Sequence, residues 1–136
     1  MRRLGIALAG MVVLGMAYVL AHWALIEVGR EVVVLRTQGP DGGWYETRLW
    51  IVDDGRYAWL HGGDSQWMRN LRERPVVELE RAGKTLRYRA HAQPGPHERI
   101  DQALRVKYGL ADRWIRFVAP DGDTAMAVRL EPLAAR

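Results

Sequence analysis

The 136-residue sequence lacks most of the residues on which catalytic centres are built. It has no cysteine, which excludes thiol nucleophiles and disulfides, and one serine, Ser65, which is accounted for as a helix cap. Its histidines are far apart in the sequence, whereas a metal centre needs several converging ligands, so no metal site is predicted. They are His22, His61, His91 and His97. No residue is therefore assigned to catalysis, and any chemistry would have to come from a bound cofactor.

Long runs of like charge are also missing. The net charge is +4, but no stretch of Lys and Arg exceeds two residues. Basic and acidic residues alternate instead, as in residues 72–74 and 78–81. This pattern is typical of a solvated surface, so nucleic acid is not expected as a partner.

One long apolar segment occurs near the N-terminus. Leu4 to Ile26 carries no formal charge, and as a helix it would span roughly 34 Å, enough for a hydrocarbon core of ~30 Å. The segment predicts a single-pass transmembrane anchor over residues 1–28, followed by a domain over residues 29–136. The protein is therefore expected in a membrane, and the charge bias slightly favours a cytoplasmic N-terminus.

Two alternatives to an anchor remain. A cleaved signal peptide would use Arg2 and Arg3 as its basic region and residues 19–21 as a cleavage site. A buried core helix is the other, but a helix that is apolar on every face has nowhere to lie in so small a domain except lipid.

The rest of the chain reads as alternating strands with short helices. Period-two alternation or β-rich apolar runs predict strands over residues 31–38, 44–52, 56–61, 76–81, 85–92 and 124–131. A short helix is expected before Pro75, and two amphipathic helices are expected before Pro120. Hairpin-joined strands pair antiparallel, so the fold class is α+β with an antiparallel sheet or barrel of about six strands.

Two places could hold a phosphate group. The Gly62-Gly63 turn opens the first short helix, where backbone N–H groups attract anions. Arg48 shares a strand face with Trp50 and could clamp phosphate, although a solvated surface arginine fits equally well. His61 precedes the turn, either as a ligand contact or as a strand-end residue facing water.

Trp67 and Asn70 lie about one helical turn apart in that first helix. Together they could offer a stacking ring and an amide to a flavin-like edge. On residue chemistry alone, a structural role is favoured, in which Trp67 packs in the core and Asn70 lies near the C-terminal end of its helix.

The motif Trp67-x-x-Asn70-Leu71, followed by Pro75-Val76-Val77-Glu78, resembles the deazaflavin-dependent nitroreductase family. That family belongs to the flavin-binding split β-barrels, like pyridoxamine-phosphate oxidase. The resemblance covers roughly Val32 to Pro132 and implies a split barrel that binds the deazaflavin coenzyme F-420 or FMN, with Trp67 and Asn70 lining the site. The family's basic phosphate loop is replaced here by residues 39–46, which contain no Lys or Arg.

The resemblance implies an oxidoreductase, and the apolar segment adds a membrane anchor. Together they predict a membrane-anchored oxidoreductase that reduces a small or lipophilic acceptor of the quinone or nitro type. Because split barrels are often dimers with sites at the interface, a homodimer is also expected. The alternative is a non-catalytic, membrane-tethered binding or assembly module with exposed Trp44, Tyr45 and Trp50 as partner contacts. The predicted cofactor-binding residues are Arg48, Trp50, His61, Gly62, Gly63, Trp67 and Asn70.

Overall fold

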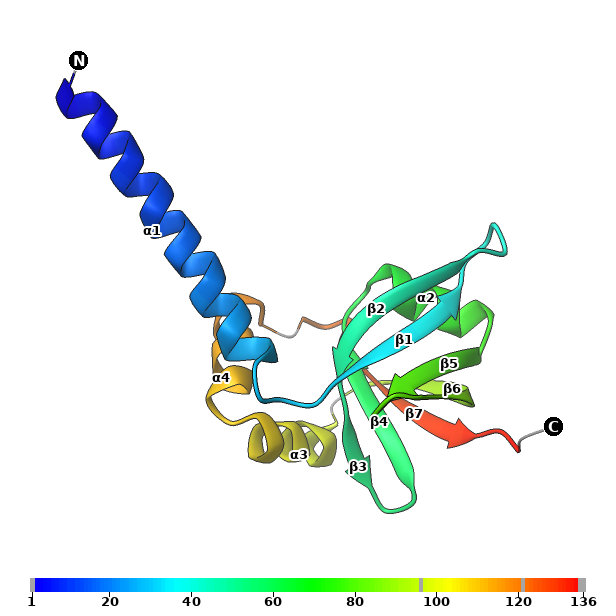
Figure 1. Ribbon diagram of the computed structural model, residues 1–136. Coiled ribbons are helices and arrows are strands. Elements are labelled where there is room, and N and C mark those ends of the chain that lie inside the picture. The colour runs from blue at the N-terminus through cyan, green and yellow to red at the C-terminus, as the bar shows by residue number, and fades with distance from the viewer. Residues whose placement is uncertain (1, 96, 121, 135–136) are drawn as a thin grey trace. The chain divides into compact units, whose positions relative to one another are not determined.

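The structure is a computed structural model that describes residues 2–95, 97–120 and 122–134 (Figure 1). The chain divides into two compact units, Met1–Arg30 and Glu31–Arg136. The first unit holds helix α1 (Arg2–Glu27). Its stretch Leu8–Glu27 is long and apolar enough to span a membrane. The predicted N-terminal helix is therefore present, and large apolar side chains along it are exposed.

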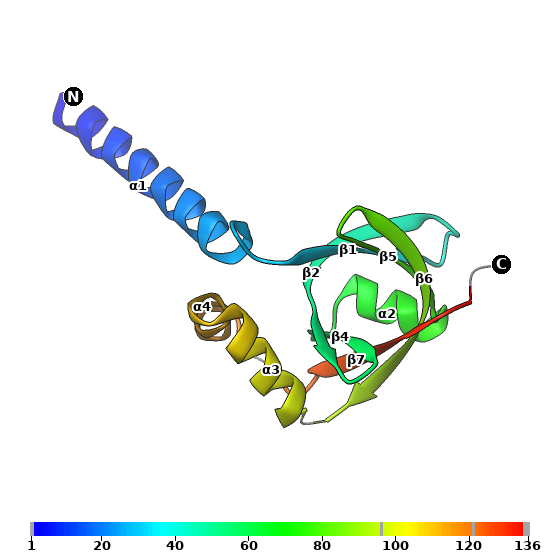
Figure 2. The same ribbon diagram turned by 60° about the horizontal axis from the view of Figure 1, so that its bottom comes forward.

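The second unit is built on one antiparallel sheet that curls around a helix (Figure 2). Its strands run in the order β2-β1-β5-β6-β7-β4-β3, which confirms the predicted α+β class and the antiparallel split barrel. The elements are β1 (Val32–Gln38), β2 (Trp44–Trp50), β3 (Val52–Asp54), β4 (Tyr57–Gly62), α2 (Gln66–Glu73), β5 (Val76–Arg81), β6 (Lys84–Pro94), α3 (Glu98–Tyr108), α4 (Leu110–Val118) and β7 (Met126–Pro132).

The strand predicted over residues 44–52 is in fact two strands, so the described sheet has seven strands instead of about six. β2 pairs with β1 as far as Trp50, whereas β3 pairs with β4 from Val52 onward. Ile51 lies between them and takes part in neither ladder. The sheet curls until its edge strands, β2 and β3, meet at Ile51. The chain therefore passes from the ladder with β1 to the ladder with β4, while the alternation of apolar residues in the sequence continues.

Side chains from α3 replace the missing ladder bonds at Ile51. The Ile51 N–H donates to the Tyr108 hydroxyl at 2.9 Å, and the Ile51 carbonyl accepts from Lys107 Nζ at 2.6 Å. A buried backbone group without a partner costs about 1–3 kcal/mol, so these bonds make the seam between β2 and β3 tolerable.

Helix α2 fills the inside of the curl. Trp67, Met68 and Leu71 are buried there against the inward-facing residues of the sheet. Those residues are Val33, Leu35, Ile51, Leu60, Val77, Leu79, Ala90, Val128 and Leu130. Fully burying one such side chain stabilises the fold by roughly 1.5–3 kcal/mol, so this cluster is the main core.

The start of α2 differs in one detail from the sequence expectation. Ser65 occupies the N-cap position, but its side chain makes no capping hydrogen bond. The Asp64 carboxylate instead accepts a bond from Arg69 at 2.8 Å. The stop before Pro75 is confirmed, because α2 ends at Glu73.

Helix α3 covers part of the outer face of the sheet. Ile100, Leu104 and Tyr108 form its buried face, as expected of an amphipathic helix, and they pack with Val52 and Ala127 in a second, smaller core cluster. Gly109 then joins α3 to α4 with φ +55° and ψ −120°, a conformation that glycine adopts without a Cβ clash.

Candidate functional site

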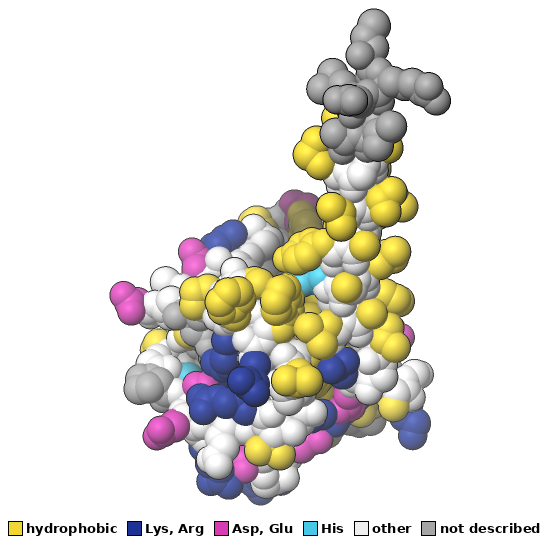
Figure 3. All heavy atoms as spheres, turned by 90° about the vertical axis from the view of Figure 1, so that its left-hand side faces the viewer, with side chains coloured by type: hydrophobic (Ala, Val, Ile, Leu, Met, Phe, Trp, Pro, Cys, Tyr) yellow, Lys and Arg dark blue, Asp and Glu magenta, His cyan; other side chains and the backbone are white. Residues whose placement is uncertain are grey.

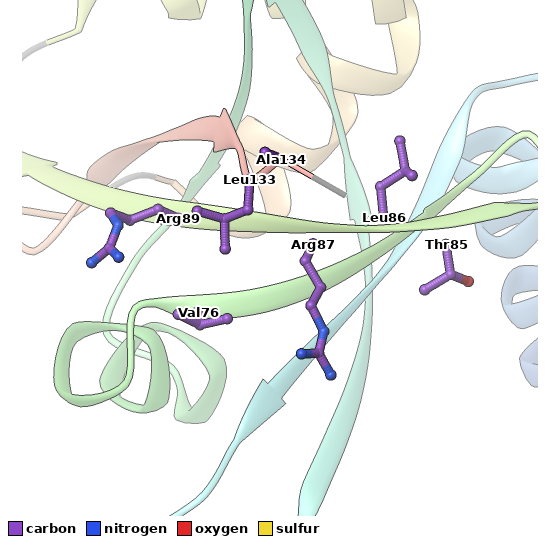
Figure 4. Close-up of a pocket in the computed structure, with 7 residues that line it drawn as sticks. All are labelled: Val76, Thr85, Leu86, Arg87, Arg89, Leu133 and Ala134. Carbon is purple, nitrogen blue, oxygen red and sulfur yellow. The ribbon is translucent and has the colours of Figure 1, made fainter. Parts of the chain in front are cut away.

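A groove of about 740 Å³ lies where β5 and β6 meet the segment after β7 (Figure 4). The Leu133 N–H donates to the Arg87 carbonyl at 3.0 Å and holds that segment beside β6. Sites for small molecules usually measure roughly 300–1,000 Å³, so this groove has the volume of a cofactor site. Its lining residues are Val76, Thr85, Leu86, Arg87, Arg89, Leu133 and Ala134.

The groove combines positive charge with an apolar wall. Arg87 and Arg89 are alternate residues of β6, so they project to the same side of the strand. Arg87 Nη2 donates to Glu78 Oε1 on the neighbouring strand at 3.1 Å, which orients its guanidinium. No acid lines the groove among the described residues, whereas Val76 and Leu133 do. The arrangement can hold an anionic group next to an apolar body.

Sequence reasoning missed this pair of arginines. The signal was present, because the alternation Thr85, Arg87, Arg89 within a predicted strand places all three on one face. The sequence did not show which other segment of the chain lies beside that face. The groove depends on Leu133 and Ala134, which follow the last strand and reach β6 only through the sheet order.

Trp67 and Asn70 lie on α2, and both are buried in the interior of the barrel. Their exposed fractions are 6% and 2%. Asn70 Nδ2 donates to the Thr37 hydroxyl at 3.1 Å, and Asn70 Oδ1 accepts from Gln66 Nε2 at 2.8 Å. Both residues are thus used by the fold, and a coenzyme contact by either one stays a prediction.

Trp50, His61 and Gly62 do share a cavity, which measures about 170 Å³ and lies below the usual size of a ligand site. The other lining residues come from α3 and α4: Leu104, Asp112, Ile115 and Arg116. Two carboxylates stand near it, and both bind Arg116: Asp112 at 2.9 Å and Asp101 at 3.1 Å. His61 Nε2 lies 3.6 Å from Asp101 Oδ1. These acids make the cavity a poor place for phosphate.

Gly63 and Arg48 line neither the groove nor the 170 Å³ cavity. Gly62 makes room for the core, because a Cβ there would lie 2.6 Å from Trp67 Cζ2. Gly63 has only Thr124 Oγ1 at 3.6 Å near its hypothetical Cβ. Arg48 is exposed on β2, opposite Val34 in the register, and lines neither the groove nor the 170 Å³ cavity.

A network of charged residues holds the seam between the two sheet edges. Arg81 donates to Glu31 at 2.6 Å and to Asp53 at 2.7 Å, and Lys107 also binds Glu31. The hydrogen bonds from Arg81 lower the pKa of both carboxyl groups below their usual values. Burial raises the pKa of Tyr108 to about 12. At neutral pH these groups are therefore fixed in one protonation state, which suits a structural role.

No group of three or more His, Asp or Glu side chains is placed to hold a metal ion within the part of the chain that the structure describes. The charged clusters found there, around Arg81 and around Arg116, consist of carboxylates already paired with cations. The groove on β6 has a volume and a charge that fit an anionic organic ligand.

Comparison with solved structures identifies the architecture. A heme storage protein from Vibrio cholerae matches with a TM-score of 0.57 and 16% identity over 79% of this chain and 84% of that chain. An F-420 reductase matches with a TM-score of 0.55 and 20% identity, over 82% and 93% of the two chains. A FAD-binding protein from Mesorhizobium loti matches with a TM-score of 0.57 and 15% identity, over 82% and 86%.

The fold is the split β-barrel. The fold that the sequence motif implied is thereby confirmed, although no protein-family model and no curated protein matches the chain. At this level of identity the likeness concerns the fold alone. These three split barrels are a heme storage protein, an F-420 reductase and a FAD-binding protein, so the fold by itself does not select a ligand.

Proposed function

We propose that this protein is a membrane-anchored split barrel that binds an anionic flavin-type coenzyme, FMN or F-420, and reduces a small or lipophilic acceptor. The observation that carries the proposal is the groove on β6, where Arg87 and Arg89 lie beside an apolar wall in a volume of about 740 Å³. The shared fold with an F-420 reductase and a FAD-binding protein supports it.

The residues of the groove fit such a coenzyme. The guanidinium groups of Arg87 and Arg89 would hold its phosphate through charge-assisted hydrogen bonds, and the Glu78 contact keeps Arg87 oriented for this. Val76 and Leu133 would contact the ring system and keep water from one side of it. When bound, the coenzyme supplies hydride-transfer chemistry that the side chains of this chain do not provide.

A retained α1 would keep the domain at a membrane, where lipophilic acceptors such as quinones dissolve. The apolar stretch Leu8–Glu27 supports this part of the proposal, because its length matches a hydrocarbon core. A homodimer with sites at its interface stays a prediction from the sequence resemblance.

Titration of the detergent-solubilised full chain with FMN and with F-420, followed by fluorescence, tests the proposal. We expect binding at or below tens of micromolar, roughly −6 kcal/mol or better. Replacing Arg87 or Arg89 by Ala should weaken the binding about tenfold or more, because a hydrogen bond to a charged group contributes about 1.5–3 kcal/mol. Arg72→Ala is the matched control, since Arg72 is an exposed arginine of α2 outside the groove.

Two results would contradict the proposal. Absence of binding by both coenzymes would remove the flavin-type function. Binding that survives the Arg87 and Arg89 variants but is lost in Trp50→Ala and His61→Ala would move the site to the smaller cavity and overturn the placement in the groove.

The second candidate function is the non-catalytic, tethered binding module. The exposed Trp44 and Tyr45 on β2 favour it, because aromatic side chains are frequent contact residues at interfaces. Trp50 does not belong to that surface, since its ring stacks on Tyr108 with centroids 4.4 Å apart. A Trp44→Ala/Tyr45→Ala variant that keeps coenzyme binding but loses biological activity would support the module.

A further inference from the structure

Strand β2 leaves one of its backbone edges open. It is the first strand in the sheet order and pairs with β1, so its other side has no neighbouring strand among the described residues. In the hairpin that joins β1 to β2, the Gly39 N–H donates to the Gly43 carbonyl at 2.9 Å. Because such bonds alternate along an antiparallel ladder, the N–H and C=O groups of Trp44, Glu46 and Arg48 point away from β1. They form a row that can receive a further strand.

The two edges of the sheet differ in how they are protected. β3, at the other end of the sheet order, has three residues, and both of its acids are bound by arginines. Asp53 binds Arg81 at 2.7 Å. Asp54 binds Arg99 at 2.6 Å. β2 has seven residues and contains no proline or lysine, the residues that most often discourage a further strand. A long edge of this kind is where another chain can add a strand.

Two large aromatic side chains at the start of β2 are exposed. Trp44 and Tyr45 are 46% and 43% exposed, and the Tyr45 hydroxyl donates to Asp41 Oδ2 at 2.9 Å, which holds its ring beside the hairpin. Hydrophobic side chains also cover α1 (Figure 3), but that helix has the length of a membrane span. This explanation does not apply to a strand of the second unit. The aromatic residues of β2 instead fit a contact with another protein chain.

The charges of β2 select the partner that fits this edge. Glu46 and Arg48 are exposed, and because they lie two positions apart they share one face of the strand. An unrelated strand offers these two charges no specific complement, whereas a second copy of β2 does. When two copies align antiparallel with Thr47 opposite Thr47, each Glu46 lies opposite the Arg48 of the other copy. The same register places Tyr45 opposite Leu49.

Both charged residues have the capacity for a contact across this edge. Arg36 uses Oε1 of Glu46 at 2.7 Å, so Oε2 can accept from another cation. The guanidinium of Arg48 has five donors, more than one carboxylate can use. The paired stretch Tyr45–Leu49 also ends before β3 begins at Val52, so the added strand does not compete with the ladder between β3 and β4.

We propose that two copies of this chain associate through their β2 edges, which pair antiparallel around Thr47. Pairing in this register makes about four backbone hydrogen bonds and two ion pairs between Glu46 and Arg48, and it joins the two sheets into one. This contact differs from a homodimer with coenzyme sites at its interface, because β1 and β5 separate β2 from β6 in the sheet order. The proposal is therefore independent of the coenzyme groove.

The absence of cysteine makes the contact testable by disulfide cross-linking, because one introduced cysteine gives one possible bridge between two copies. In the proposed register the two Thr47 Cα atoms lie about 4.5 Å apart, which is within the range of a disulfide. The detergent-solubilised full chain with Thr47→Cys should therefore form a cross-linked dimer under mild oxidation. Thr85→Cys is the matched control, since Thr85 is an exposed threonine of β6, and this variant should stay monomeric.

Charge reversal then tests whether the partner is a second copy in this register. Added to Thr47→Cys, either Glu46→Arg or Arg48→Glu alone places like charges opposite each other in both pairs and should lower the dimer yield about tenfold. A mixture of the two variants restores both ion pairs, so it should restore cross-linking as a heterodimer and also show that both variants fold.

Three results would overturn the proposal. Thr47→Cys that cross-links no better than Thr85→Cys would leave the β2 edge to an extended segment of some other protein. Charge variants that cross-link alone as well as their parent would show that Glu46 and Arg48 do not face each other. A mixture that fails to cross-link would exclude the antiparallel register.

Discussion

Helices α2 and α4 are two short helices of similar length with closely spaced apolar residues, yet they have opposite surroundings. The sheet encloses α2, which buries Trp67, Met68 and Leu71, whereas α4 buries Ala111 and Asp112 and leaves Phe117 exposed. The comparison shows that apolar spacing predicts an apolar face and does not predict what covers it. For α2 the cover is the barrel, whereas Leu110 and Phe117 of α4 stay exposed.

The sharpest contrast is expected between Trp67→Ala and Phe117→Ala. Removing the Trp67 ring leaves a cavity inside the barrel and should lower the free energy of unfolding by about 3–5 kcal/mol. Removing the exposed Phe117 ring should change it by less than about 0.5 kcal/mol. Urea unfolding of the full chain in detergent, followed by near-ultraviolet circular dichroism, measures both. Equal losses would show that α4 is packed as tightly as α2.

A smaller effect should distinguish the two adjacent glycines before α2. The Cβ in Gly62→Ala would collide with the Trp67 ring at 2.6 Å, and overpacking of this kind costs about 1–3 kcal/mol. Gly63→Ala meets no atom closer than 3.6 Å and should be nearly neutral. The same unfolding assay applies. A neutral Gly62→Ala variant would mean that Trp67 is not held where the core requires it.

The smallest effect concerns pH and the outer helices. The pKa of Glu31 is lowered, first by its hydrogen bonds from Arg81 and further by Lys107 of α3. The stabilisation from this lowered pKa is therefore complete above the ordinary pKa of 4.5 and is lost as pH falls through the lower value in the folded protein. Acid should thus weaken hydrogen-exchange protection in α3 before it does so in α2.

Glu31→Gln is the control for the pH prediction. This variant lacks the carboxylate at every pH, so its stability should fall less steeply than that of the wild type between neutral pH and about pH 3. Asp53, whose pKa is also lowered by Arg81, keeps part of the slope in both proteins. Identical slopes in the two proteins would show that the Glu31 carboxylate does not hold α3 to the seam.

The sequence predicted the elements better than their meeting points. Alternation and turn residues placed the strands and the helix before Pro75, because those signals are local. The sequence did not predict the break between β2 and β3 at Ile51. The backbone of Ile51 hydrogen-bonds with Lys107 and Tyr108, which lie more than fifty residues away in the sequence. For the same reason Arg87 was seen as a strand residue and not as part of a groove with Leu133.

The residues predicted to form one site lie in different places, because long-range packing determines their positions. Trp67 and Asn70 lie where the helix pattern put them, but the curl of the sheet closes over both. Trp50 and His61 line one small cavity because α3 and α4 pack beside them. No local sequence pattern predicts this packing.

The position of β7 in the sheet has a consequence for how the chain is made. β7 lies between β6 and β4, and β4 in turn pairs with β3, so the sheet order cannot be completed until the last strand has left the ribosome. α1 precedes all of these strands in the chain, so it leaves the ribosome while β3 and β4 still lack their neighbour. Assembly of the barrel is therefore a late event in the synthesis of these residues.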